Sequence, residues 1–260
     1  MSDQLPLPPV EMRQLVAPTD PKFFDNPDHT LVFPDIPLEK QASVFDFGCG
    51  CGRIARQLIQ QEPRPKTYLG IDLHKGMIKW CVDNLKPLAS GFDFLHHDVY
   101  NLGFNPNGKT DRIHFPVKDR TFSLVIAWSV FTHLLENQAE FYLKEVARIL
   151  DRDGIFLSTW FTFNKQEFPM MQTFQNALYI NETDLTNAVI FDRAWLKTAL
   201  ANVGLVITRI TPPQIRGFQW LTEIEHSGGG RPEVDFPEDR SPIGIYRSPV
   251  IEKRVDKIGL

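Results

Sequence analysis

The stretch from Val44 to Leu58, VFDFGCGCGRIARQL, places a carboxylate, three glycines and two thiols within a few positions. Glycines at alternate positions after an apolar run let the backbone turn tightly and approach a ligand closely. A helix beginning near Arg53 would also point unpaired backbone N–H groups at that ligand. The two thiols are a weak metal signal, because no second Cys pair or spaced His pair accompanies them. We therefore expect a ligand site lined by backbone, and no metal site.

Two further carboxylates follow apolar runs. Asp72, in YLGIDL, ends the expected second strand, and Asp98, in FLHHDV, ends the expected third strand. A carboxylate at the end of the second strand can accept hydrogen bonds from both ribose hydroxyls of a nucleoside, and one after the third strand can accept from an adenine amine. Asp72 could instead be an ordinary turn residue, and Asp98 a plain strand exit. His96 and His97 lie on opposite sides of the strand, which argues against a compact metal cluster.

From Ser43 onward, segments with the hydrophobic period of a strand alternate with segments with the hydrophobic period of a helix. These elements would position the carboxylates. Strands are expected at 43–47, 67–73, 92–99, 121–128, 154–161, 205–210 and 217–226, and helices near 53–59, 75–86, 137–150 and 193–202. This alternation predicts an α/β fold with a doubly wound, mostly parallel seven-stranded sheet. The short turn TPPQIRG predicts an antiparallel hairpin at one edge. The ligand crevice is then expected beyond the carboxyl ends of the strands, beside the first strand.

The pattern divides the chain into three parts. Residues 1–42 are rich in proline and are expected to form an arm or lid with at most one short helix, near 10–16. Residues 43–226 hold the sheet, and within them the aromatic and polar segment 162–192 is a candidate lid or substrate-binding insertion. Residues 227–260 form a polar, Pro-rich tail.

Composition argues against several classes of protein. The formal net charge is −4 and the basic residues are scattered, which disfavours a nucleic-acid partner. No apolar run approaches the roughly 18 residues that cross a bilayer, and the first residues lack the pattern of a secretion signal. Three cysteines are an odd number and fit reduced thiols, so a cytoplasmic location is expected.

The order of these motifs resembles one family. Asp46-x-Gly48-x-Gly50-x-Gly52 resembles the first motif of the class I S-adenosylmethionine-dependent methyltransferases, whereas a dinucleotide fingerprint would need glycine at Arg53. Later stretches, AWSVFTHL and EVARILDRDGIFLSTW, resemble the family segments that follow the fourth strand. The resemblance extends from Ser43 to Trp160.

The resemblance implies a Rossmann-like methyltransferase fold that binds S-adenosylmethionine and releases S-adenosylhomocysteine. Asp46 could also merely cap N–H groups of its own loop. The cofactor-binding residues implied are Asp46, Gly48, Cys49, Gly50, Gly52, Asp72, Leu73, Asp98, Val99, Trp128 and Ser129.

A general base is needed only if the acceptor carries a proton at neutral pH. His133 in SVFTHL is the leading candidate, since it follows the fourth strand beside the expected methyl position; it could equally be a cap or a packed surface residue. Glu136 and His226 are weaker candidates. By resemblance, the acceptor is expected to be an oxygen or nitrogen of a small molecule, such as a sugar or a natural product.

Other residues could wall the acceptor pocket, although most aromatic residues could equally belong to the core. Arg13 in the arm could reach a carboxylate or phosphate of the substrate, unless the arm is purely structural. The candidate aromatic residues are Trp128, Trp160, Phe161, Phe163, Phe168, Phe174 and Tyr179.

Three rival interpretations share parts of this pattern. An NAD-dependent oxidoreductase shares the sheet and the ribose acid, but Arg53 and the lack of a recognisable hydride site argue against it. A non-catalytic cofactor-binding or partner-binding module is the second rival. A methyltransferase acting on RNA or protein is the third, although no base-flipping motif supports it. The sequence leaves the acceptor and the oligomeric state open.

Overall fold

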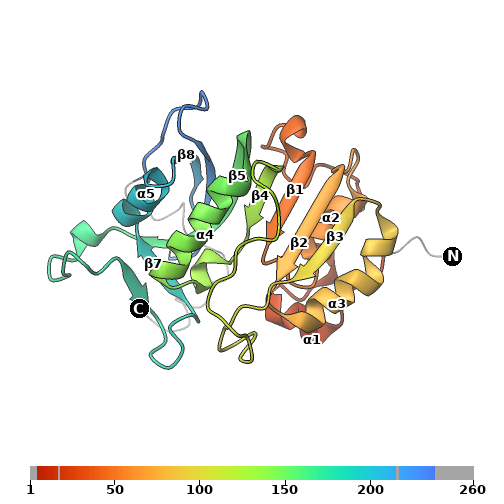
Figure 1. The fold of residues 1–260 in the computed structure, drawn as a ribbon, viewed down its shortest axis with the longest axis horizontal. Coiled ribbons are helices and arrows are strands. Elements are labelled where there is room, and N and C mark those ends of the chain that lie inside the picture. Colours follow the sequence, from red (N-terminus) through yellow and green to blue (C-terminus); the bar gives the residue numbers. More distant parts are fainter. Residues whose placement is uncertain (1–4, 17, 215–216, 238–260) are drawn as a thin grey trace, which may run out of the picture.

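The computed structural model describes residues 5–16, 18–214 and 217–237. These residues fold around one central sheet with helices on both faces (Figure 1). The helices are α1 (Val10–Val16), α2 (Arg53–Gln60), α3 (Lys75–Asn84), α4 (Glu136–Ile149) and α5 (Arg193–Ala201). The strands are β1 (Ser43–Phe47), β2 (Thr67–Asp72), β3 (Phe92–His96), β4 (Phe122–Ala127), β5 (Leu150–Phe163), β6 (Ala177–Tyr179), β7 (Val189–Asp192), β8 (Leu205–Thr211) and β9 (Trp220–His226).

The sheet confirms the predicted doubly wound, mostly parallel topology. Strands β3, β2, β1, β4 and β5 are parallel neighbours in that order. Strand β9 pairs antiparallel with β5 and with β8, which is the predicted edge hairpin. Further along β5, strand β7 pairs with it in parallel, and β6 pairs antiparallel with β7. The sheet thus has two strands more than the seven predicted, because β6 and β7 are too short to show a periodic pattern.

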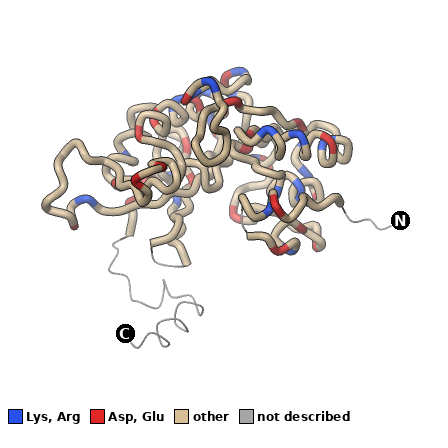
Figure 2. The backbone as a smooth tube through the Cα atoms, turned by 90° about the horizontal axis from the view of Figure 1, so that it is seen from below, with Lys and Arg blue, Asp and Glu red and all other residues tan. Residues whose placement is uncertain are grey.

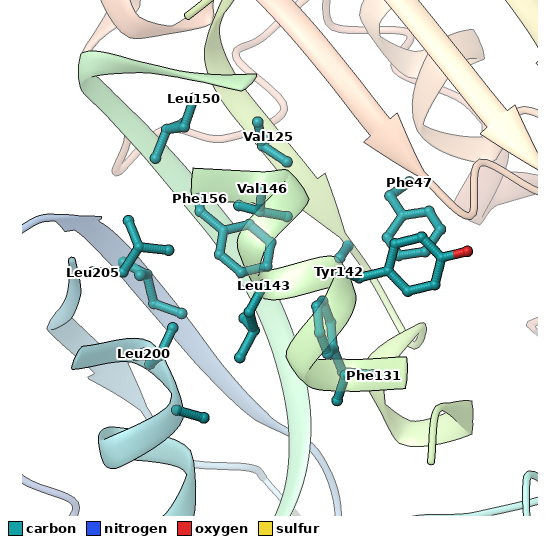
Figure 3. Packing of buried hydrophobic residues seen from close by; sticks show 14 of the residues in the cluster. Phe47, Val125, Phe131, Tyr142, Leu143, Val146, Leu150, Phe156, Leu200 and Leu205 are labelled. Atoms are coloured by element: carbon teal, nitrogen blue, oxygen red, sulfur yellow. The ribbon is translucent and has the colours of Figure 1, made fainter. Parts of the chain in front are cut away.

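Successive residues of β1 point to opposite faces of the sheet, as the pleat requires. Phe45 packs with α4 and α5 in one buried cluster, whereas Val44 packs with α2 and α3 in another. Figure 3 shows the first cluster, in which Leu143 and Val146 of α4 lie against Phe156 of β5. Burying each such side chain contributes roughly 1.5–3 kcal/mol, so these clusters hold the strand ends in register.

Several element boundaries differ from the predictions. Helix α4 begins at Glu136, and the side chain of Gln138 accepts a hydrogen bond from Leu135 N, so Asn137 is not its cap. The chain passes directly from α4 into β5, with no turn at Gly154. Strand β3 ends at His96, two residues before Asp98.

A buried side chain of α2, Arg56, makes several hydrogen bonds to the arm. The Arg56 guanidinium donates to the carbonyl oxygens of Leu5, Pro6 and Phe24 and also pairs with Asp25. A buried, always charged guanidinium needs several acceptors, and the arm supplies them. The arm therefore lies in a fixed position over α2.

The described part of the predicted tail also packs on the sheet. Val234 N donates to Ile207 O, and the Phe236 ring meets Trp220 edge-on at 5.5 Å between ring centroids. Figure 2 shows that basic and acidic residues are interspersed along the described chain. Within the described residues, no helix has the length and apolar character to cross a membrane.

Candidate functional site

A cavity of about 460 Å³ lies beyond the carboxyl ends of β1, β2 and β4, where the topology predicts the ligand crevice. Two groups of its lining residues carry the chemistry. We call one group the glycine-loop wall: Asp46, Gly48, Cys49, Gly50, Arg53 and Asp72. We call the other group the imidazole wall: Phe104, His133, Leu134, Phe161, Asn187 and Phe218.

Asp72, at the end of β2, organises the glycine loop. Its Oδ2 accepts from Gly50 N at 2.8 Å, and its Oδ1 accepts from His74 N at 2.7 Å. Burial raises the pKa of Asp72, whereas these two backbone hydrogen bonds act in the opposite direction. Each carboxylate oxygen can accept more than one hydrogen bond, so both can still receive a ligand hydroxyl.

Asp46 is a buried carboxylate with one unsatisfied oxygen. The Tyr68 hydroxyl donates to its Oδ2 at 2.6 Å, while Oδ1 has no hydrogen-bond partner among the described residues. Burial raises the pKa of Asp46 to about 7, although the Tyr68 bond and the nearby Arg53 charge lower it. A buried acceptor without a partner is costly, and a cationic ligand group at Oδ1 would satisfy it.

The glycines of the loop have different surroundings. Gly48 and Gly50 line the cavity with φ values of 81° and 55°, a region that favours glycine. Gly52 has a φ of 79° but lies outside the cavity lining. A Cβ at this residue would lie 2.5 Å from Leu85 Cδ1 and 3.0 Å from Cys81 Sγ. Gly52 therefore allows α2 and α3 to approach each other.

The thiols behave as small apolar groups. Cys49, Cys51 and Cys81 are all buried and free. Burial raises the pKa of each thiol, to about 12 for Cys51, so none is a reactive thiolate at neutral pH. Among the described residues, no group of three or more His, Cys, Asp or Glu side chains is arranged to hold a metal ion.

Ser129, just after β4, has an unusual backbone. Its φ is 59°, which costs a residue with a Cβ about 1–2 kcal/mol. Its N–H donates to Thr159 Oγ1 at 2.7 Å, and its hydroxyl is 2.9 Å from Gln219 Oε1. These bonds from β5 and from the segment before β9 hold the strained residue beside Trp128 in the cavity wall. Strained backbone of this kind clusters at functional sites.

His133 lies in the cavity wall with a defined proton position. Its Nδ1 is 2.9 Å from the backbone oxygen of Thr186, in the segment before β7. A carbonyl oxygen can only accept, so Nδ1 carries the proton, and in a neutral imidazole Nε2 keeps its lone pair. The ring also meets Phe104 nearly edge-on, at 6.1 Å between ring centroids. The arrangement fits a general base.

The structure brings most of the predicted site residues together. Gly52 and Asp98 are outside the lining, and Asp98 Oδ1 accepts from Asn105 Nδ2 at 3.1 Å. The predicted residues that line the cavity are Asp46, Gly48, Cys49, Gly50, Asp72, Leu73, Val99, Trp128, Ser129 and His133.

Other predicted residues point elsewhere. Glu136 Oε1 accepts from Asn176 Nδ2 at 2.8 Å, and His226 Nε2 is 3.3 Å from Leu150 O; neither lines the cavity. Arg13 donates within the arm, to the carbonyl oxygens of Pro8 and Thr19. Of the seven predicted aromatic residues, two line the cavity, Trp128 and Phe161.

Several residues that line the cavity are not among the site residues predicted from the sequence. Leu15 and Val16 of α1 reach the cavity, and Val16 Cγ1 lies only 2.7 Å from where a Gly50 Cβ would be. His97 and Tyr142 also line the cavity, with His97 Nε2 2.8 Å from the Tyr142 hydroxyl. Burial lowers the pKa of His97 to about 4, so the ring is neutral at pH 7. No local pattern marks these residues, because the cavity unites them from distant segments.

Comparison with known proteins adds independent evidence. The sequence model of the family described as "Methyltransferase domain" matches residues 45–158. The chain is 31% identical over 116 residues to a fatty-acid O-methyltransferase from Mycolicibacterium smegmatis. That match covers 45% of this chain and 36% of the mycobacterial protein, so the matched stretch spans about a third of the relative's length.

Solved structures with the same fold include two methyltransferases. A Listeria monocytogenes protein assigned to the S-adenosylmethionine-dependent methyltransferases has a TM-score of 0.51 and 17% identity, covering 74% of this chain and 94% of its own. A mitomycin 7-O-methyltransferase has a TM-score of 0.51 and 12% identity, covering 74% of this chain and 51% of its own. At such identities the likeness concerns the fold. Residues 45–158 thus match the methyltransferase domain family model, and the described chain has the fold of these methyltransferase structures.

Proposed function

We propose that this protein transfers the methyl group of S-adenosylmethionine to an oxygen or nitrogen of a small, uncharged acceptor. The observation that carries this proposal is that one cavity unites the glycine-loop wall with an imidazole whose Nε2 can accept a proton. The first wall suits a nucleoside and an amino acid, and the second suits a protonated nucleophile.

The residues present fit S-adenosylmethionine. The unsatisfied Asp46 Oδ1 can accept from the ammonium of its methionine part, and Arg53 supplies a cation for the carboxylate in the same wall. Asp72 can accept hydrogen bonds from the ribose hydroxyls, and the residues after β3 lie where the adenine ring is expected. Asp98 is our proposed acceptor for the adenine amine, although this needs its side chain to turn from Asn105.

The chemistry supplied by the bound cofactor is an electrophilic methyl group on a sulfonium. The protein holds the acceptor against that group and excludes water, which lowers the barrier by positioning. With a hydroxyl acceptor, His133 Nε2 would take the proton that the oxygen loses as it is methylated, while the methyl–sulfur bond breaks and S-adenosylhomocysteine is released. The carbonyl of Thr186 then stabilises the imidazolium through Nδ1.

The imidazole wall suits an uncharged acceptor with an apolar body. Its side chains are three aromatic rings, a leucine, an amide and the imidazole itself. Among the described residues that line the whole cavity, Arg53 is the only Lys or Arg, and it belongs to the glycine-loop wall. A carboxylate acceptor would lack a cation beside His133, so we favour a phenol, a sugar hydroxyl or a neutral amine.

Calorimetric titration of the protein with S-adenosylhomocysteine and with NADH tests the cofactor. Saturable binding of the first and none of the second supports the proposal, and the reverse would support the oxidoreductase. Transfer of labelled methyl from S-adenosylmethionine is then measured with phenols, sugars, amines and a fatty acid. Labelling of a hydroxyl or amine supports the proposed acceptor class, whereas labelling of the fatty acid alone would overturn it.

A further inference from the structure

A chain of hydrogen bonds connects the exit of β3 to the candidate base. Asn105 Nδ2 donates to Asp98 Oδ1 and to Val99 O, and the backbones of Asn101 and Asn105 pair with each other. Asn101 Nδ2 then donates to the hydroxyl of Thr186 at 3.1 Å. The chain thus runs from Val99, which lines the cavity, to the residue whose carbonyl contacts the imidazole, and its bond from Asn105 to Val99 O does not depend on the position of the Asp98 side chain.

Thr186 is held at three of its polar atoms. Its N–H and its hydroxyl both donate to Asp184 Oδ1, at 3.0 and 2.6 Å, and its hydroxyl accepts from Asn101. Its carbonyl oxygen lies 2.9 Å from His133 Nδ1. The side chain therefore fixes the backbone unit whose carbonyl lies beside the imidazole, and within the described hydrogen bonds the hydroxyl of Thr186 bonds to Asp184 and Asn101.

We propose that Thr186 is a positioning residue for the His133 base, and that Asn101 couples this position to the loop after β3. The inference rests on the proposed function, since it needs His133 to act as a base. Its physical basis is the tautomer of the imidazole. If the carbonyl moves away, the proton is free to sit on Nε2, and a nitrogen that already carries a proton cannot accept another from the acceptor.

The loop around Thr186 supplies a matched control. Thr183 lies three residues earlier, and its hydroxyl donates to Asn181 Oδ1 within the same loop, away from His133. Thr186→Val removes both hydroxyl bonds while keeping the shape of the side chain. Thr186→Ser keeps the hydroxyl, and Thr183→Val makes the same chemical change without touching the chain of bonds.

The tautomer of His133 is measured directly by ¹⁵N NMR of histidine-labelled protein at about pH 8.5, where an ordinary imidazole is neutral. The His133→Asn variant identifies the signal. We expect the wild type, Thr186→Ser and Thr183→Val to carry the proton on Nδ1. We expect Thr186→Val to show a mixture with the proton on Nε2. An unchanged Nδ1 tautomer in folded Thr186→Val would overturn the inference.

Kinetics provide the second measurement, once an acceptor is identified. Thr186→Val should lower kcat about tenfold, with KM for S-adenosylmethionine unchanged, and Thr186→Ser should restore the rate. A loss that Ser does not restore, or one that Thr183→Val reproduces, would show a merely structural role. The NMR result needs neither cofactor nor acceptor, so failure of the proposed function, seen as full activity of His133→Asn, is distinguishable from failure of this inference.

Discussion

The carboxylate of Asp72 and the backbone N–H of Gly50 are joined by a hydrogen bond of 2.8 Å between Oδ2 and N. The bond fixes the glycine loop after β1 against the end of β2. The same carboxylate holds His74, the residue that caps α3. One side chain thus sets the distance between the two chain segments on which the proposed nucleoside would lie.

Asp72→Ala should weaken S-adenosylhomocysteine binding by roughly 1–3 kcal/mol, through lost charge-assisted hydrogen bonds and a loosened loop. Calorimetric titration measures this change. Asp83→Ala is the matched control, because Asp83 is exposed on α3 and pairs only with Lys79 in the described contacts. Equal affinity of wild type and a folded Asp72→Ala variant would remove Asp72 from the cofactor site.

Asp46 should make cofactor binding depend on pH. In the free protein its pKa is about 7, so the carboxyl is partly protonated at neutral pH. Pairing with an ammonium requires the ionised form, which lowers the pKa in the complex and releases a proton on binding. Affinity should therefore rise as pH increases from about 6 to 7.5.

The proton release is measured by calorimetry at about pH 6.5 in buffers with different ionisation enthalpies. Asp46→Asn should bind more weakly and should lose both the proton release and this pH dependence. If the variant releases as many protons as the wild type, Asp46 does not contact the ligand ammonium.

His133→Asn should lower kcat about 100-fold with a protonated acceptor, because the amide can still donate to Thr186 O but cannot accept a proton as a base does. The affinity for S-adenosylhomocysteine should stay unchanged. His226→Asn is the matched control, since His226 contacts Leu150 O outside the cavity lining. A similar loss in both variants would show that the effect is not specific to the base.

Gly52→Ala should destabilise the fold rather than the cofactor contacts. The added Cβ would overlap Leu85 in a positive-φ conformation, at a predicted cost of about 2–4 kcal/mol in the free energy of unfolding. Gly217→Ala is the control for the φ effect alone. Its φ is 78° and a Cβ there meets no atom of the described residues within 4 Å, so about 1 kcal/mol is expected.

Urea denaturation of the two variants compares these costs. Equal destabilisation by both substitutions would show that Leu85 yields to the methyl group and that Gly52 is needed only for its backbone conformation. A variant of Gly52 with full stability and weakened cofactor binding would instead return this glycine to the ligand site.

The sequence by itself determined the parallel sheet and the place of its crevice. The hydrophobic periods of strands and helices depend only on residues close in sequence. The alternation of strands and helices from Ser43, and the position of Asp72 at a strand end, could therefore be predicted directly. The same reasoning gave the glycine spacing, but it could not separate Gly50, which lines the cavity, from Gly52, which packs against α3.

Only the tertiary structure decided which residues face one another across the cavity. The hydrogen bond between His133 and Thr186 spans 53 positions of the sequence, and the one between Ser129 and Gln219 spans 90. No local sequence pattern can predict either bond. The insertion also carries two short strands, β6 and β7, on either side of the loop that holds Thr186, and Arg56 of α2 binds the arm. Such contacts arise when the whole core closes, because burial of the sheet faces, rather than local propensity, sets which distant segments meet.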